Sequence, residues 1–345
     1  MSIRSYSLRL GGGACTAAAL LLSLVIPDAL NGWLVGFAFW SSLPIGALVL
    51  VMMIRLIPGR WSRVLTAPAE AASLVLPLAL LASLPLLIGT GALYPWSGQA
   101  EEGFRGAYLV PWSFALRTIG FFALTIALAL ALLLRPRWST PLAAGGLILF
   151  VPFDTVIAFD WLMSLDPEFH SSGFGLYVLS IQVTIALCLL ILVHLTTEPE
   201  DCAPPAGVLL SSLLLWAYFA FMQFFIIWSA DLPQGVVWYQ HRSGGAWTAV
   251  IWIVAALHLV PTFLLLFAPF RRGRAWLISV CIAVLLGKAL EVCWLVLPDT
   301  SASLAAVVVT LLSLGGLGAV TAAIFPEALR RRRTPALARE RKAVS

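Results

Sequence analysis

Long runs of apolar residues, separated by short polar stretches, dominate the chain from end to end. About 20 consecutive apolar residues are needed for one helix to cross a bilayer, and on that measure the runs predict ten transmembrane helices. They are expected at residues 10–27, 32–54, 70–92, 109–134, 140–163, 172–196, 206–230, 246–270, 275–297 and 302–326. The pattern therefore predicts an all-α polytopic membrane protein built from helical bundles.

Composition leaves little chain for a soluble domain. Of the 345 residues, 61% are hydrophobic and only 11% are charged, and the mean hydropathy is +0.98. Values this extreme are typical of membrane proteins. We expect a single transmembrane domain over residues 1–329, followed by a basic tail over residues 330–345.

The placement of Lys and Arg predicts the orientation. Ten helices put the N-terminus, the loops near residues 55–63, 135–137 and 271–274, and the tail on one side of the membrane. These segments hold every Lys and Arg except Arg105, Arg117, Arg242 and Lys288. Because positive residues favour the cytoplasmic side, both termini are expected to be cytoplasmic. The basic tail is then a stop signal that faces anionic lipid, and no nucleic-acid binding is expected.

Two polar stretches interrupt the apolar pattern, one at residues 153–177 and one at residues 225–247. The predicted topology places the turn at the end of each stretch outside the membrane, where the two turns would form one rim. The candidate residues of this outer rim are Trp161, Asp166, His170, Trp238, Tyr239, His241 and Arg242.

Ionisable and polar residues also lie inside the predicted helices, and they gather in the outer half. Such residues are costly in a bilayer and typically mark proton or ion pathways. The candidates for proton transfer are Asp154, Arg117, Asp160, Glu291, Lys288, His258 and Gln223. Together they predict a polar half-channel that opens outward.

Helical spacing suggests how these groups pair. Lys288 and Glu291 are three residues apart and can contact each other on one helix. Asp154 and Asp160 are separated by about 240° around their helix, so they face different neighbours. Arg117, at a similar depth on the adjoining antiparallel helix, is the expected partner of Asp154. The alternative is that these are structural ion pairs, with His258 as a packing residue.

Ligand sets for redox centres are missing from the sequence. The five cysteines form no CxxC pair, and His194 and His258 lie at different depths, which excludes bis-histidine haem ligation. Phosphate-loop, zinc-protease and nucleophile-elbow motifs are also missing. We expect no catalytic residue in this chain and no cofactor of its own, so any redox centre belongs to a partner.

The two turns carry specific motifs, which read Phe159-Asp160-Trp161-Leu162-Met163-Ser164-Leu165-Asp166-Pro167 and, later, Trp228, Leu232-Pro233, Trp238-Tyr239 and His241-Arg242. They resemble the signature turns of the ActF-type integral membrane subunit of bacterial alternative complex III, a quinol:cytochrome c oxidoreductase. That subunit is similar to the polysulfide reductase (NrfD-like) membrane-subunit superfamily, and the plan of ten helices agrees.

The resemblance implies a subunit of the bacterial inner membrane that works beside an NrfD-like quinol-binding subunit, an iron–sulfur subunit and c-type cytochrome subunits. Haem c and the iron–sulfur clusters would lie in those partners. This chain would contribute the proton-transfer half-channel. One alternative is a membrane anchor that binds quinone directly through the rim residues. Another is a self-standing transporter, against which stands the lack of inverted repeats or paired broken helices.

The sequence predicts that the chain binds no haem, metal or iron–sulfur cluster of its own, because it lacks the ligand sets. Metal analysis of the isolated subunit checks this expectation. One iron per chain that survives removal of all partners would contradict it.

Overall fold

The computed structural model describes residues 3–98, 103–197, 202–298 and 303–344, with the side chains of residues 3–6, 197 and 333–344 left outside the description. The α-helices are α1 (Ile3–Val25), α2 (Leu30–Leu56), α3 (Arg60–Ser73), α4 (Leu76–Ile88), α5 (Thr90–Leu93), α6 (Gly103–Tyr108), α7 (Pro111–Leu134), α8 (Ser139–Trp161), α9 (Phe174–Thr197), α10 (Ala203–Ser229), α11 (Pro233–His241), α12 (Ala246–Leu265), α13 (Ala268–Arg272), α14 (Arg274–Val296) and α15 (Leu304–Val344). Short 3₁₀ helices are η1 (Pro27–Ala29), η2 (Pro95–Gly98), η3 (Pro136–Trp138) and η4 (Met163–Leu165).

The prediction of an all-α polytopic membrane protein is confirmed. Within the described ranges, 9 helices are long and apolar enough to cross a membrane, and α3 with α4 form a bent pair that can serve as a tenth span. The predicted number of membrane crossings is therefore reached only if α3 and α4 together form one span.

The third span differs from the prediction. It was expected as one helix over residues 70–92, but the structure begins it at Arg60 and bends it by 45° between Ser73 and Leu76. The bend coincides with Pro77 in the first turn of α4. Proline has no amide hydrogen to continue the helical ladder, and its ring crowds the preceding turn.

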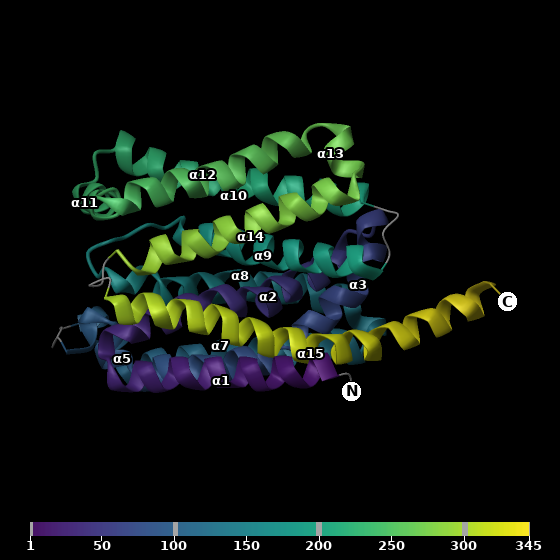
Figure 1. Cartoon of the computed structure of the whole chain (residues 1–345), viewed down its shortest axis with the longest axis horizontal. Helices are drawn as coiled ribbons and strands as arrows, with labels where there is room; N and C mark the ends of the chain where they lie inside the picture. The colour runs from purple at the N-terminus through teal and green to yellow at the C-terminus, as the bar shows by residue number, and fades with distance from the viewer. Residues whose placement is uncertain (1–2, 99–102, 198–201, 299–302, 345) are drawn as a thin grey trace.

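Two groups of helices lie side by side (Figure 1). The first bundle consists of α2, the bent pair α3–α4, α7 and α8, and the second bundle consists of α9, α10, α12 and α14. Helices α1 and α15 pack against each other and against α2. Helix α2 also contacts α9 and α14, so it joins the two bundles.

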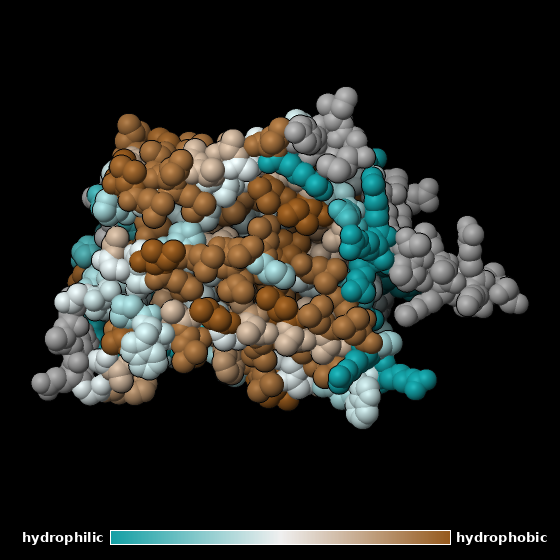
Figure 2. Space-filling model, turned by 90° about the horizontal axis from the view of Figure 1, so that it is seen from below, coloured by the Kyte–Doolittle hydropathy of each residue, from teal (hydrophilic) through white to brown (hydrophobic). Residues whose placement is uncertain are grey.

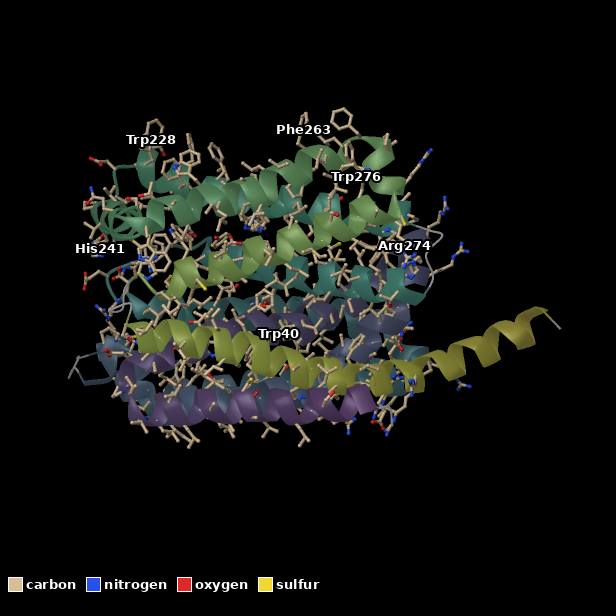
Figure 3. The ribbon with its side chains drawn as sticks, in the orientation of Figure 1. Trp40, Trp228, His241, Phe263, Arg274 and Trp276 are labelled. Carbon is tan, nitrogen blue, oxygen red and sulfur yellow. The ribbon has the colours of Figure 1, made fainter. Side chains whose placement is uncertain are left out.

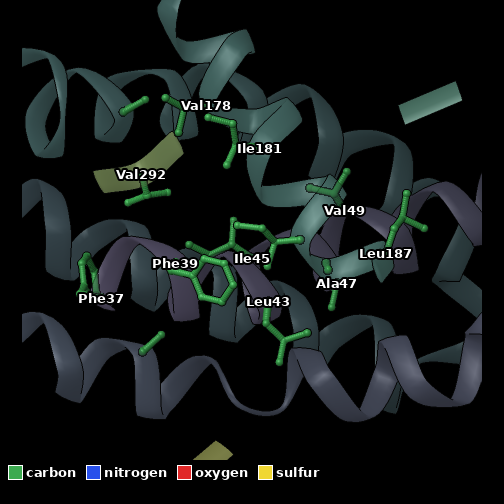
Figure 4. Packing of buried hydrophobic residues seen from close by; sticks show 14 of the residues in the cluster. Phe37, Phe39, Leu43, Ile45, Ala47, Val49, Val178, Ile181, Leu187 and Val292 are labelled. Carbon is green, nitrogen blue, oxygen red and sulfur yellow. The ribbon is translucent and has the colours of Figure 1, made fainter. Parts of the chain in front are cut away.

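Helix α2 is the most enclosed of the spans, with 89% of its apolar window buried. Figure 4 shows Phe39 and Ile45 of α2 on the side of Val178, Ile181 and Val292 of the second bundle, whereas Phe37 packs against Phe122 of α7 and Trp161 of α8. One face of α2 carries glycines instead of large residues, because α15 approaches it closely there. A Cβ on Gly32 would lie 2.3 Å from the carbonyl oxygen of Ala306, and one on Gly36 would lie 2.2 Å from the Ser313 hydroxyl. This Gly-xxx-Gly spacing is typical of close helix packing in membranes.

The surface agrees with a bilayer environment. The face in Figure 2 is mostly hydrophobic, and its hydrophilic residues collect toward one end. Figure 3 places Arg274 at that end of the bundle and His241 at the opposite end, with the apolar length of the helices between them. The aromatic side chains do not all form a belt at the membrane interface: Trp112 is 69% exposed, whereas Trp96 is only 1% exposed.

Helix α1 begins and α15 ends at the same end of the bundle (Figure 1). At this end Arg55 donates a hydrogen bond to the Glu70 carboxylate, and Arg9 lies 3.9 Å from Glu327. Helix α15 continues to Val344 and so includes most of the basic tail expected from residue 330. The side of the membrane that both ends face stays a prediction.

The topology predicts that the turns near residues 168 and 234 are external. In intact cells, Glu168→Cys and Gln234→Cys should react with a membrane-impermeant thiol reagent, whereas Arg63→Cys should react only after lysis. All three positions are exposed. Gly235 is unsuitable, because a Cβ there would lie 2.6 Å from the Ile227 side chain. The reverse labelling pattern would show that the orientation is inverted.

Candidate functional site

The two polar turns meet at one end of the second bundle, as the sequence predicted. The Phe169 ring, from the first turn, stacks on the Trp238 ring of α11 with centroids 4.3 Å apart and planes 17° apart. The Ser171 hydroxyl also donates a hydrogen bond of 3.4 Å to Gln223 Oε1 of α10. Residues far apart in the sequence therefore form one surface.

Arg242 fixes the second turn against α14. Its guanidinium lies 3.8 Å from the Trp238 ring centroid and donates to the carbonyl oxygens of Trp238 (3.3 Å) and Leu295 (3.2 Å). The Trp294 indole donates to the Arg242 carbonyl at 3.0 Å. Burial lowers the pKa of Arg242 to about 9, although the charge of Asp166 opposes this shift. The residue thus stays cationic at neutral pH while it is only 1% exposed.

A cavity of about 750 Å³ lies behind this turn, enclosed mainly by α10, α11 and α12. Its inner wall is completed by Tyr177 of α9 and by Glu291 and Trp294 of α14. Most of its lining is aromatic or aliphatic, and the polar groups are few. A volume of 300–1,000 Å³ with a small number of placed polar groups is the usual character of a ligand pocket.

Tyr239 of α11 and Gln223 of α10 are two polar residues of the lining that interact with each other. Burial raises the pKa of the Tyr239 hydroxyl to about 12, while a hydrogen bond with Gln223 and the charge of Arg242 act in the opposite direction. The hydroxyl therefore stays protonated at neutral pH and can donate a hydrogen bond. Both side chains line the cavity.

Glu291 is the centre of the deeper polar cluster. The Lys288 ammonium donates to Glu291 Oε2 at 2.8 Å, which confirms the pair predicted from helical spacing. The other carboxylate oxygen accepts from the Trp216 indole at 2.7 Å and from the Tyr177 hydroxyl. Lys288 is fully buried and Glu291 is 1% exposed. A buried pair of this kind is tolerated only when the remaining hydrogen-bonding capacity is also used.

His258 lies against the same cluster. Its ring stacks on Trp216 with centroids 4.2 Å apart, and its Nε2 is 3.7 Å from Glu291 Oε2. Its Nδ1 is 2.7 Å from the Val254 carbonyl; since a carbonyl only accepts, Nδ1 carries a hydrogen. Gly287 permits this approach of α12 to α14, because a Cβ there would lie 2.6 Å from His258 Cε1.

The prediction that Arg117 pairs with Asp154 is wrong. Arg117 of α7 instead forms a two-pronged pair with Asp160 of α8, through Nε to Oδ2 at 2.6 Å and Nη2 to Oδ1 at 3.0 Å. Its guanidinium also donates to Ser113 Oγ at 2.6 Å and lies 3.8 Å from the Tyr108 ring centroid. The pair lies in the first bundle, apart from the cavity lining.

Asp154 occupies a different environment. It is fully buried beside Gln182 of α9, and within the described part of the chain neither carboxyl oxygen accepts a hydrogen bond of normal geometry. Nor does any described Lys, Arg or His lie within ion-pair distance of it. The expectation that Asp154 and Asp160 face different neighbours is confirmed, because one faces α9 and the other faces α7.

The residues predicted to form the outer rim lie in different parts of the structure. Tyr239 and Arg242 line the cavity, and Trp238 supports its outer wall. Asp166, His170 and His241 do not line the cavity. Trp161 belongs to the core of the first bundle, where its ring lies 4.8 Å from that of Phe37 and its indole donates to Thr118 at 3.1 Å.

Sequence reasoning missed several residues that matter to the cavity. Tyr177, Trp216 and Trp294 all contact Glu291 or Arg242, and none was among the candidates. A signal for two of them was available. Trp294 follows Glu291 by one helical turn, and Trp216 precedes Gln223 by two turns, so each shares a helix face with a candidate.

No model of a known protein family matches the chain, and no curated protein gives a significant match. Among the described residues, no group of three or more His, Cys, Asp or Glu side chains could hold a metal ion. The function is therefore inferred from the side chains themselves.

Replacing each of the two aspartates of α8 by asparagine should have very different effects on the stability of the fold. Asp160→Asn leaves the Arg117 charge, only 18% exposed, without its counter-charge, which should destabilise the fold by about 3–5 kcal/mol. Asp154→Asn removes no ion pair and should leave stability nearly unchanged. Thermal unfolding of the two purified variants in detergent, beside the wild-type chain, measures both effects. Equal losses of stability would contradict this account of Asp154.

Proposed function

We propose that the chain is an integral membrane subunit of a quinol-oxidising complex, related to the ActF-type subunits of alternative complex III, and that it transfers protons through the outer half of its second bundle. The observation that carries the proposal is the position of Glu291. Its carboxylate lines a cavity near the end of the bundle predicted to be external, and it contacts a buried lysine and a histidine.

The geometry around Glu291 supports a relay. Two ionisable side chains lie close to the same carboxylate oxygen, Glu291 Oε2. Lys288 Nζ is 2.8 Å from it and His258 Nε2 is 3.7 Å from it. His258 Nε2 has no hydrogen-bond partner among the described residues, and with Nδ1 carrying the hydrogen it can accept a proton from this direction. Ionisable residues inside a membrane bundle, arranged in contact with one another, are the usual construction of a proton path.

The outward part of the path would run through the cavity. Tyr239 and Gln223 lie between the Glu291 cluster and the outer turn, and both line the same space. Asp154 of the first bundle is a further protonatable group at depth, but it is not in contact with this cluster. The Arg117–Asp160 pair fits a structural role better, since all its groups are engaged by neighbours.

The rest of the complex follows from the signature turns. An NrfD-like quinol-binding subunit, an iron–sulfur subunit and c-type cytochromes would supply the redox centres in the inner membrane of a bacterium. In the joined turns, His170 and His241 are exposed and Asp166 is half-buried, so this surface would be available to such partners. Co-purification with haem-bearing subunits supports this assignment, whereas a chain that purifies alone from its native membrane favours a self-standing transporter.

Two variants distinguish a proton-transfer role of Glu291 from a purely structural role of its pair with Lys288. Glu291→Gln alone leaves Lys288 buried without its counter-charge, so loss of assembly is expected at a cost of about 3–5 kcal/mol. The double variant Lys288→Gln with Glu291→Gln removes both charges and should restore assembly. If Glu291 transfers protons, turnover and proton release in the double variant should still fall at least about tenfold.

The measurements are the yield of the complex, read from the haem absorbance that co-purifies, and quinol oxidation with proton release in vesicles. Asp154→Asn removes a buried carboxyl outside the Glu291 cluster, so comparison with it shows whether a loss of proton release belongs to this cluster. A double variant with full yield, full turnover and full proton release would show that the pair is only structural.

A further inference from the structure

We propose that Asp154 is held as a neutral carboxylic acid, and that it forms a cyclic pair with the side-chain amide of Gln182 which joins the two helical bundles. In this pair the carboxyl hydrogen bonds to the amide oxygen, and the amide nitrogen donates to the other carboxyl oxygen. The proposal does not rest on the proton relay, since neither side chain contacts the Glu291 cluster or lines the cavity.

Three buried oxygen atoms meet at this contact without a hydrogen-bond partner among the described residues. They are both carboxyl oxygens of Asp154 on α8 and the Oε1 atom of Gln182 on α9. Asp154 is 0% exposed and Gln182 is 5% exposed, and the two side chains interact with each other. Buried polar atoms in proteins are nearly always hydrogen-bonded. These three atoms are also the oxygen atoms of a carboxylic acid–amide pair.

One proton gives all three oxygen atoms a partner. An ionised carboxylate and an amide oxygen can only accept hydrogen bonds, so an ionised Asp154 leaves Gln182 Oε1 without a donor whichever way the amide is turned. A protonated carboxyl has one O–H donor and keeps a second oxygen as an acceptor. The O–H then donates to Gln182 Oε1, and Gln182 Nε2 donates to the remaining carboxyl oxygen.

A negative charge on Asp154 would have no compensating cation in the described part of the chain. Its helix packs against α2, α7 and α9. Arg55 of α2 and Arg117 of α7 each pair with a different carboxylate, and His194 of α9 lies more than three turns from Gln182. An isolated charge inside a membrane bundle is costly, and binding a proton removes that cost.

Close packing on both sides of the pair favours a proton over a larger ion. A Cβ on Gly46 of α2 would lie 2.4 Å from the Gln182 carbonyl oxygen. A Cβ on Gly175 of α9 would lie 2.6 Å from the Thr155 side chain of α8. In the described ranges, no second carboxylate, histidine or cysteine completes a metal-ligand set here. Helix α9 is therefore held tightly against both α2 and α8.

The pair connects elements that otherwise meet through apolar contacts. Asp154 belongs to the first bundle and Gln182 to the second, and α8 contacts α9 directly. Figure 4 shows Val178 and Ile181 of α9 on the side of α2, so the surroundings of the amide are apolar. Hydrogen bonds between helices in such surroundings fix their rotation as well as their contact.

Infrared spectroscopy of the full-length chain in lipid nanodiscs, isotope-labelled at the carboxyl carbon of aspartate, tests the protonation. At neutral pH we expect the carbonyl band of a protonated carboxylic acid, and the label should displace it. Asp154→Asn should remove this band, whereas Asp166→Asn, in the outer turn, should leave it unchanged. Circular dichroism checks that each variant is folded, and the label identifies an aspartic acid in the wild-type chain without any substitution.

Gln182→Leu should keep the band and move it to higher frequency, because the carboxyl loses its hydrogen-bonded partner. A wild-type spectrum without the band, or a band that Asp154→Asn leaves in place, would overturn the proposal. Loss of the band on addition of Na⁺ at constant pH would show that a metal ion replaces the proton, and would overturn it as well.

The joining of the bundles is tested by thermal unfolding of Asp154→Leu, Gln182→Leu and the double variant. Each single variant leaves one buried polar side chain without its partner, so we expect the Tm to fall by about 2–4 °C. The loss in the double variant should be smaller than the sum of the two single losses. Additive losses would show that the two side chains are not coupled, and would overturn the proposed joint.

Discussion

One buried carboxylate constrains the whole second bundle. Glu291 cannot be charged inside a membrane protein unless its oxygens are engaged, and each of the four helices supplies a group to it. Tyr177 comes from α9, Trp216 from α10, His258 from α12 and Lys288 from α14 itself. The rotation of each helix is thereby fixed, and the small Gly287 is required where α12 comes closest.

In the first bundle, a different ion pair stabilises the buried carboxylate. Arg117 and Asp160 join α7 to α8 through two hydrogen bonds, and the planar guanidinium also lies on the Tyr108 ring. Along most of its length α2 packs without charged groups, since its glycines allow α15 to approach and its large side chains fill the space on the other faces. The fold thus combines close packing at its centre with a buried ion pair in the outer part of each bundle.

The cavity lies between α10, α11 and α12, and the Arg242–Trp238 contact holds the turn that follows α11 against it. This places an apolar space, open toward lipid, directly against the Glu291 cluster.

The sequence by itself determined what depends on local spacing and on the bilayer. Apolar length identified the spans, and the three-residue separation of Lys288 and Glu291 identified their pair, because both follow from helical geometry. The sequence could not decide which of the two aspartates pairs with Arg117. Depth along a helix is visible in a sequence, but the rotation of one helix against its neighbour depends on side-chain packing, and that rotation presents Asp160 instead of Asp154 to α7. The sequence could not predict the cavity either. Residues of five helices enclose it, and only their tertiary arrangement leaves the space between them empty.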